Sequence, residues 1–274
     1  MPSRSGAGIP GPAPDRTPVG TIPAVPLYKE QGIVLGSVKL AEADKIVTIL
    51  TQGEGKVRAV AKGIRRTTSR FGARLEPFTH VSLMLYRGRS LDTVTQADIV
   101  SSFRPIRDDF GLFSAGETML EAVDKVAEEH ERNVRLFLLL LQGLRALETR
   151  PADPPAVAEA FLLRLLGLSG FAPALSACAA CGDTAVTRFS ASQGGAVCEA
   201  CQDRDTRRAN PAALRWLDSI ATGDLATVGH DPIVPEVRGE ARALLFGFSE
   251  YHIDRRIRSL PLLARMSRPA ATPS

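Results

Sequence analysis

Residues 45–62, KIVTILT-QGEG-KVRAVAK, decide the fold of the first part of this 274-residue chain. Two β-rich runs flank the turn 52–55, and this pattern predicts a β-hairpin. In the second run the odd-numbered residues are apolar, whereas Arg58 and Lys62 lie among the even-numbered ones. Successive side chains of a strand point to opposite faces, so one face is expected in a core and the other toward a charged partner.

Three further β-rich runs surround this hairpin, at residues 29–38, 81–86 and 93–103. Five short strands separated by glycine-containing or charged turns predict a small barrel, with an OB-fold as the leading candidate. We expect this domain to span residues 27–107. It follows a proline-rich segment, 1–26, that is expected to be a disordered tail.

After Pro105 the hydrophobic period changes from two to about 3.6, which predicts helices. Ser114 and Glu117 have the spacing of a capping box and are expected to open the first one. The all-α domain is predicted to span 108–260 and to be followed by a disordered tail at 261–274, so the fold class is α+β. The other predicted helix starts are Asn133, Asp153, Asn210 and about Glu236.

Four cysteines form two CxxC pairs, Cys178/Cys181 and Cys198/Cys201, separated by sixteen residues. This spacing is typical of a four-cysteine zinc site, predicted here as an insertion at about 176–204. Four thiolates complete the tetrahedral shell of one Zn²⁺ and leave no position for a reacting water, so the ion would be structural. A redox dithiol pair and a site that has become metal-free are the alternatives, although a redox motif needs only one CxxC.

Positive charge is concentrated in the predicted barrel. Residues 27–107 carry a net charge of +7, whereas residues 108–274 carry −4. A stretch without any acidic residue runs from Gly55 to Leu75, and a one-sign cluster on a strand and its loop attracts phosphates. A solvated charged face is the plainer interpretation, and an anionic membrane surface is a lesser one. The basic residues of this stretch are Lys56, Arg58, Lys62, Arg65, Arg66, Arg70 and Arg74.

Phe71 lies among these cations and is the best candidate for a ring that stacks on a nucleobase. The other aromatic residues of the barrel segment are expected in its core. Together with the seven cations, Phe71 completes the set of predicted DNA-contacting residues.

Several functional classes are excluded by missing patterns. The chain has no P-loop and no nucleophile elbow, and its four histidines are scattered, so we expect no enzyme. Its longest strongly apolar stretch, 136–141, has six residues, far short of the roughly twenty that span a bilayer. No secretory signal is recognisable, and a cytoplasmic protein that does not bind membranes is expected.

Three stretches together carry a family resemblance: GIVLGSVKLAEADKIVT at 32–48, GKVRAVAKGIRR at 55–66 and RFGARLEPF at 70–78. They are joined by GFAP at 170–173, shortly before the cysteines. With this order of parts, the chain resembles the RecO family of bacterial recombination mediators over about residues 28–255. Some members of that family lack the cysteines.

The resemblance implies a protein of the RecF pathway that binds single- and double-stranded DNA and anneals complementary strands. It implies work with RecR, and indirectly with RecF, in helping RecA load onto DNA coated by single-stranded-DNA-binding protein. It also implies capture of that protein's acidic carboxyl-terminal tail and a location at the nucleoid. The alternative from another class is a zinc-stabilised adaptor that binds a protein partner and does not anneal DNA.

Overall fold

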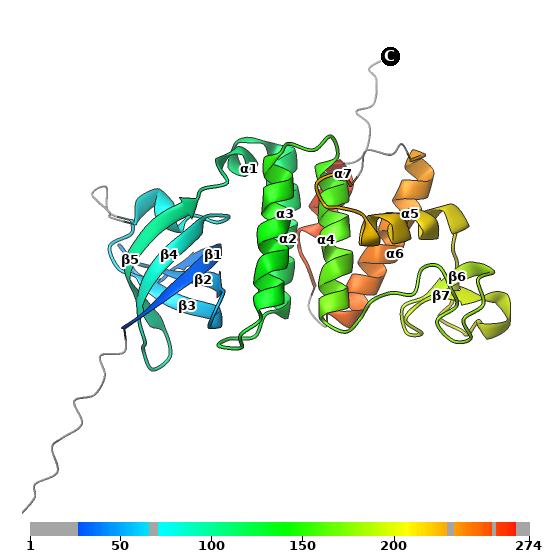
Figure 1. The fold of residues 1–274 in the computed structure, drawn as a ribbon, viewed down its shortest axis with the longest axis horizontal. Coiled ribbons are helices and arrows are strands. Elements are labelled where there is room, and N and C mark those ends of the chain that lie inside the picture. The colour runs from blue at the N-terminus through cyan, green and yellow to red at the C-terminus, as the bar shows by residue number, and fades with distance from the viewer. Residues whose placement is uncertain (1–26, 66–70, 229–232, 254–255, 267–274) are drawn as a thin grey trace, which may run out of the picture.

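The computed structural model describes residues 27–65, 71–228, 233–253 and 256–266. A β-barrel lies at one end of an elongated molecule, a layer of helices forms the middle, and a small sheet with the cysteines lies at the other end (Figure 1). No described helix is long and apolar enough to cross a membrane. The predicted α+β class, with an amino-terminal barrel and a module inserted between helices, is confirmed.

The barrel is closed in the strand order β1-β2-β3-β5-β4. All neighbouring strands are antiparallel except β3 and β5, which are parallel. The predicted alternation is confirmed on β3, where Val57, Ala59 and Ala61 are fully buried and Arg58 is exposed. The strands are β1 (Leu27–Lys39), β2 (Lys45–Thr51), β3 (Gly55–Ala61), β4 (His80–Tyr86) and β5 (Asp92–Ser101).

The helices follow directly from the barrel. Three predicted caps are confirmed, because the side chains of Asn133, Asp153 and Asn210 each accept a hydrogen bond from a backbone N–H in the first turn. Such caps satisfy donors that have no partner within the helix. The helices are α1 (Arg104–Asp108), α2 (Phe110–Val126), α3 (Val134–Glu148), α4 (Pro154–Leu168), α5 (Pro211–Thr222), α6 (Pro235–His252) and α7 (Leu260–Met266).

The predicted capping box at Ser114 is wrong. Helix α2 begins at Phe110, and the side chain of Asp109 caps it by accepting a hydrogen bond from Leu112 N at 2.9 Å. Ser114 is instead buried inside the helix, and its hydroxyl donates to the Phe110 carbonyl. The earlier aspartate satisfies the free N–H groups, so the helix starts before the serine.

The carboxyl-terminal tail predicted at 261–274 is also wrong in part, because α7 occupies its first residues. Leu260 and Leu263 of α7 are buried in the helical core. Both carboxylate oxygens of Glu121, on α2, accept backbone N–H groups that precede α7, from Arg258 and Ser259 at 2.9 Å each. Residues 267–274, like the predicted tail at 1–26, lie outside the described residues.

The barrel is packed closely onto the helices. Phe78, which lies two residues before β4, has a positive φ of 73° and is fully buried. A methyl group added to Gly116 of α2 would lie 2.7 Å from its ring, so only glycine admits this contact. On the other side, the loop between α2 and α3 lies along β3, where His130 N donates to the Lys56 carbonyl at 3.0 Å. These contacts set which side chains of the barrel remain exposed.

Candidate nucleic-acid interface and metal centre

Cations from two strands and from the loop after β3 lie at one rim of the barrel. Lys39 of β1 is directly opposite Lys45 of β2 in the strand register. Lys45 in turn pairs with Ala61 of β3, which is followed by the exposed Lys62. Like charges directly opposite one another repel, so this rim favours an anionic partner. Lys39 and Lys45 were missed from the sequence, although the length of the β1–β2 hairpin could have indicated their pairing.

Arg65 extends this basic rim through the loop after β3. Its side chain is exposed, and its Nη1 donates to the Glu42 carbonyl at 2.6 Å. Its backbone N–H also donates to the Ala43 carbonyl at 3.1 Å. Arg74, in the short 3-10 turn Gly72–Leu75 (η1), is exposed as well. The predicted contacts Arg66 and Arg70 lie outside the described residues.

Two of the predicted cations are engaged with the helical part. The Lys56 ammonium donates to the backbone carbonyl of Asp124 at 2.7 Å and lies 3.5 Å from that residue's carboxylate. Lys56 is only 7% exposed, so the expectation that it faces a DNA strand is wrong. Arg58 stays exposed, but its guanidinium lies 3.8 Å from the Glu129 carboxylate, which reduces its local positive potential.

Phe71 does not form an open stacking platform. It is 6% exposed and belongs to the barrel core, together with Ile64 and Leu75 from the same loop. The expectation of a ring available to nucleobases is therefore wrong at this residue. Burial of this large apolar ring in the core of a small barrel is strongly favourable, and it occurs although the neighbouring residues in sequence are basic.

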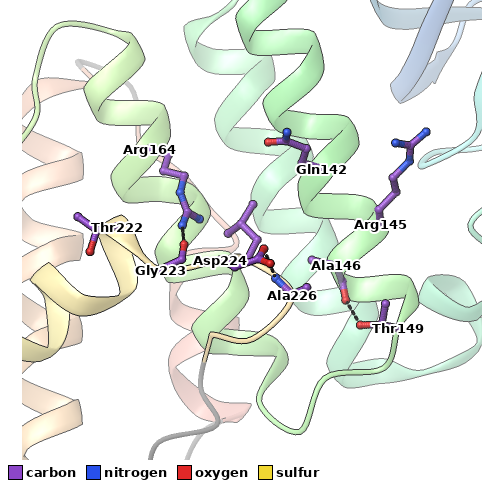
Figure 2. Close-up of a pocket in the computed structure, with 10 residues that line it drawn as sticks. Gln142, Arg145, Ala146, Thr149, Arg164, Thr222, Gly223, Asp224 and Ala226 are labelled. Carbon is purple, nitrogen blue, oxygen red and sulfur yellow. Dashed lines mark hydrogen bonds between the residues drawn. The ribbon is translucent and has the colours of Figure 1, made fainter.

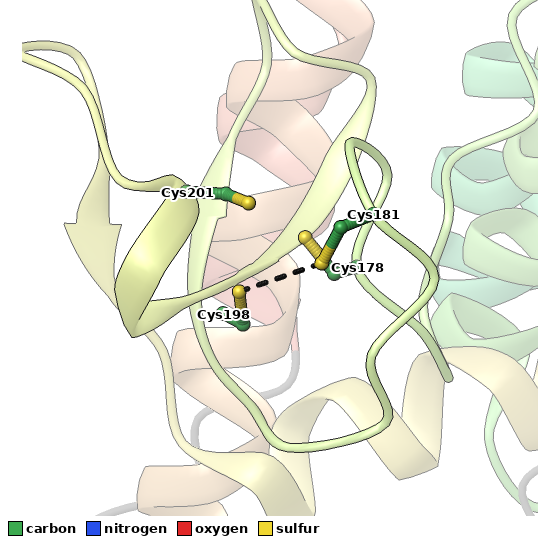
Figure 3. Close-up of side chains that lie close together, drawn as sticks. All are labelled: Cys178, Cys181, Cys198 and Cys201. Carbon is green, nitrogen blue, oxygen red and sulfur yellow. Dashed lines mark hydrogen bonds between the residues drawn. The ribbon is translucent and has the colours of Figure 1, made fainter.

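The four cysteines meet in the inserted module, as Figure 3 shows. Their sulfur atoms all lie within 4.8 Å of one another, and those of Cys181 and Cys198 are 3.7 Å apart. Tetrahedral zinc with Zn–S bonds of about 2.3 Å requires sulfur separations of about 3.8 Å. The arrangement therefore has the size of a four-thiolate metal site. The module contains β6 (Val186–Ser190), β7 (Gly195–Cys198), the 3-10 turn η2 (Glu199–Cys201) and β8 (Arg207–Arg208).

The thiols of this cluster influence one another strongly. Backbone hydrogen bonds, first of all at Cys198, lower the pKa of Cys178 to about 6. Hydrogen bonding to Cys181 and then to Cys198 raises the pKa of Cys201 to about 12. Four thiolates at this distance repel one another unless a cation lies between them. The donor set therefore fits a metal ion that holds all four sulfurs in their ionised form.

A second candidate site is an open cavity of about 450 Å³ beside α3 and α4 (Figure 2). Arg164 donates to the Gly223 carbonyl at its wall, yet Nη1 of the same guanidinium is buried without a hydrogen-bond partner among the described residues. Burial lowers the pKa of Arg164, and Asp224 opposes this shift. Arg145 adds an exposed guanidinium, and Ala146 and Leu225, which are only 4% and 6% exposed, line the apolar part of the wall.

With these sites defined, comparison with known families decides where the chain belongs. A family model described as "Recombination protein O N terminal" matches residues 25–103, which include the barrel. A second, "Recombination protein O C terminal", matches residues 107–261, which include helices α2 to α6 and the cysteine module. The chain belongs to the RecO family.

Curated relatives named DNA repair protein RecO agree with this assignment. The relative from Bifidobacterium longum is 41% identical over 239 residues, which cover 86% of this chain and 98% of that protein. The relative from Nocardioides sp. is 43% identical over 245 residues, 87% of this chain and all of that protein. The relative from Frankia casuarinae is 42% identical over 246 residues, 88% of this chain and all of that protein. This RecO-family chain is thus matched over nearly the whole length of its relatives.

Proposed function

We propose that this protein is a DNA-binding recombination mediator that anneals complementary strands and assists RecA loading on DNA coated by single-stranded-DNA-binding protein. The observation that carries the proposal is the basic rim of the barrel, defined by Lys39, Lys45, Lys62 and Arg65. Cations gathered at one rim neutralise phosphates and release counterions, which is the main source of sequence-independent affinity. Bringing two polyanions together needs no nucleophile or general base, so the proposed activity involves no turnover chemistry.

We infer that the ion held by the four cysteines is Zn²⁺ and that it stabilises the inserted module. Four sulfur ligands suit zinc, which has no redox chemistry, and the closed shell leaves no site for a substrate. The module lies at the far end of the molecule from the barrel (Figure 1). Zinc is therefore proposed to support the fold of the module, separately from the DNA contacts of the barrel.

The cavity of Arg164 and Arg145 is our candidate for the acidic carboxyl-terminal tail of single-stranded-DNA-binding protein. A peptide carboxylate would give the buried Arg164 Nη1 the acceptor that it lacks, and charge-assisted hydrogen bonds of this kind are comparatively strong. Apolar side chains of the tail would contact Ala146 and Leu225. RecR, and indirectly RecF and RecA, are proposed as the other partners, and the protein would act at the cytoplasmic nucleoid.

An annealing assay tests the proposal against the protein adaptor. Complementary oligonucleotides that carry a fluorescent donor and acceptor are mixed with the full chain, with and without single-stranded-DNA-binding protein. We expect faster annealing than without the chain, and a clear loss of this acceleration in the Lys62→Gln/Arg65→Gln variant. Equal acceleration by the variant and the parent would refute the barrel rim as the DNA surface. No acceleration by either would favour the adaptor.

A further inference from the structure

Asp44 stands among the cations of the barrel rim, yet its carboxylate binds protein backbone. Its Oδ1 accepts a hydrogen bond from Gly63 N at 2.7 Å. Its own carbonyl accepts from Leu40 N at 3.1 Å and Ala41 N at 3.4 Å, which closes the β1–β2 hairpin. We propose that Asp44 is a positioning residue for DNA binding, because it ties this hairpin to the basic loop after β3. The inference rests on the proposed function of the barrel rim.

The tie is made where the chain leaves the barrel. Gly63 follows Lys62 directly and has a positive φ of 67°, so the backbone turns sharply between two proposed DNA-contacting residues. An acceptor on the Gly63 N–H holds this turn in one conformation. Two residues later, Arg65 also bonds the hairpin, through the carbonyls of Glu42 and Ala43. Arg65 Nη1 also donates to the Ala41 carbonyl at 3.5 Å, so four consecutive hairpin residues, 41–44, accept hydrogen bonds from the loop.

The core supports this arrangement from below. Ile64, between Gly63 and Arg65, is 7% exposed and packs in the barrel core. Lys62, two residues before Ile64, and Arg65, directly after it, are both exposed. The backbone that carries both cations is thus held in place before DNA arrives, so less backbone freedom needs to be lost on binding. Such preorganisation increases affinity without adding a contact.

The negative charge of Asp44 means that electrostatics and positioning predict opposite changes in DNA affinity when this residue is replaced. A carboxylate near a DNA strand repels phosphates, so electrostatics alone predicts tighter binding whenever this charge is removed. Positioning predicts weaker binding when the acceptor is removed and no weakening when only the charge is removed. Asp44→Ala removes both, whereas Asp44→Asn removes the charge and keeps an oxygen that can accept from Gly63. The two variants therefore separate the two effects.

The test measures binding of a fluorescent single-stranded oligonucleotide by anisotropy over a salt series, with the full chain. We expect Asp44→Ala to bind about two- to tenfold more weakly than the parent, the range that corresponds to one net hydrogen bond. Its plot of log affinity against log salt should also be shallower. Asp44→Asn should bind at least as tightly as the parent. Asp44→Ala binding as tightly as Asp44→Asn would overturn the inference.

Two controls keep the outcomes distinct. Hydrogen exchange at the Gly63 amide should be faster in Asp44→Ala than in Asp44→Asn, at an unchanged thermal midpoint. If Asp44→Ala does not fold, Asp44→Ser takes its place, because the serine hydroxyl is too short to replace the carboxylate at Gly63. Lys62→Gln tests the barrel rim independently of Asp44: unaltered DNA binding by this variant contradicts the rim as the DNA surface. Weakened binding by Lys62→Gln, with equal binding by the two Asp44 variants, contradicts only the role of Asp44.

Discussion

Lys56 and Lys62 lie at the two ends of the same run of sequence, yet the structure assigns them opposite tasks. The Lys56 ammonium is buried against Asp124, whereas Lys62 is exposed at the barrel rim. Replacing each with glutamine removes one positive charge in both cases. We expect Lys62→Gln to weaken DNA binding without changing stability, and Lys56→Gln to lower stability without changing the salt dependence of DNA binding.

The magnitudes follow from the contacts. One phosphate contact contributes a slope of about −0.7 to a plot of log affinity against log salt for single strands, so Lys62→Gln should flatten the slope by about 0.7. The Lys56 ammonium donates to a carbonyl at 2.7 Å in a nearly closed site. A hydrogen bond with a charged partner contributes about 1.5–3 kcal/mol, so Lys56→Gln should lower the free energy of unfolding by about that amount.

Fluorescence anisotropy with a single-stranded oligonucleotide, from 50 to 200 mM salt, measures the slopes, and urea unfolding followed by circular dichroism measures stability. Each variant is the control for the other, because both lose the same charge. A flatter slope for Lys56→Gln, together with an unchanged slope for Lys62→Gln, would refute the assignment. In that case the DNA strand would follow the buried side of β3, and the interface between barrel and helices would have to open.

Three more outcomes are expected. Elemental analysis should find about one zinc per chain, and Cys198→Ser should lose the metal and have a lower thermal midpoint than the parent. A parent chain without metal that has the same thermal midpoint as the metal-bound chain would contradict a structural ion. Gly116→Ala should lower the free energy of unfolding by about 1–3 kcal/mol because its methyl group would overlap Phe78. Gly239→Ala should not, because among the described residues a methyl group there has no neighbour within 4 Å other than adjacent residues and its own helix backbone. Equal effects of the two variants in urea unfolding would contradict this packing. Burial raises the pKa of Glu159 from 4.5 to about 7, although Arg242 opposes this shift. The folded state therefore binds this proton more tightly than the unfolded state, and the stability that the proton contributes should be lost as the pH rises from 4.5 through about 7. Glu159→Gln should flatten that part of the stability–pH curve, and an unaltered curve would count against the raised pKa.

Local signals were the most reliable guides to the fold. Alternation along 56–62 predicted the buried face of β3, and polar caps such as Asn133 predicted where helices begin, because both depend on neighbours a few residues away. The capping box predicted at Ser114 was wrong because another local signal, the cap at Asp109, starts the helix five residues earlier. The cysteine spacing predicted a cluster of the size of a metal site, which the structure contains.

The candidate DNA surface could be predicted only in part. A run of cations indicates charge but not direction, and direction at Lys56 depends on Asp124, sixty-eight residues away. Lys39 joins the rim through its register with Lys45, which requires the hairpin to be paired. The burial of Phe71 likewise depends on how the loop returns to the barrel core.

The amino-acid sequence alone determined the succession of strands and helices up to α6, the four-sulfur cluster and the excess of positive charge in the barrel segment. Periodicity, caps and CxxC spacing involve residues that are close together in the sequence, so they can be recognised without knowledge of the tertiary structure. Tertiary structure alone decided which cations face solvent, which pair with a carboxylate and which residue ties hairpin to loop. Those outcomes depend on segments that become neighbours only when the barrel closes and packs against α2.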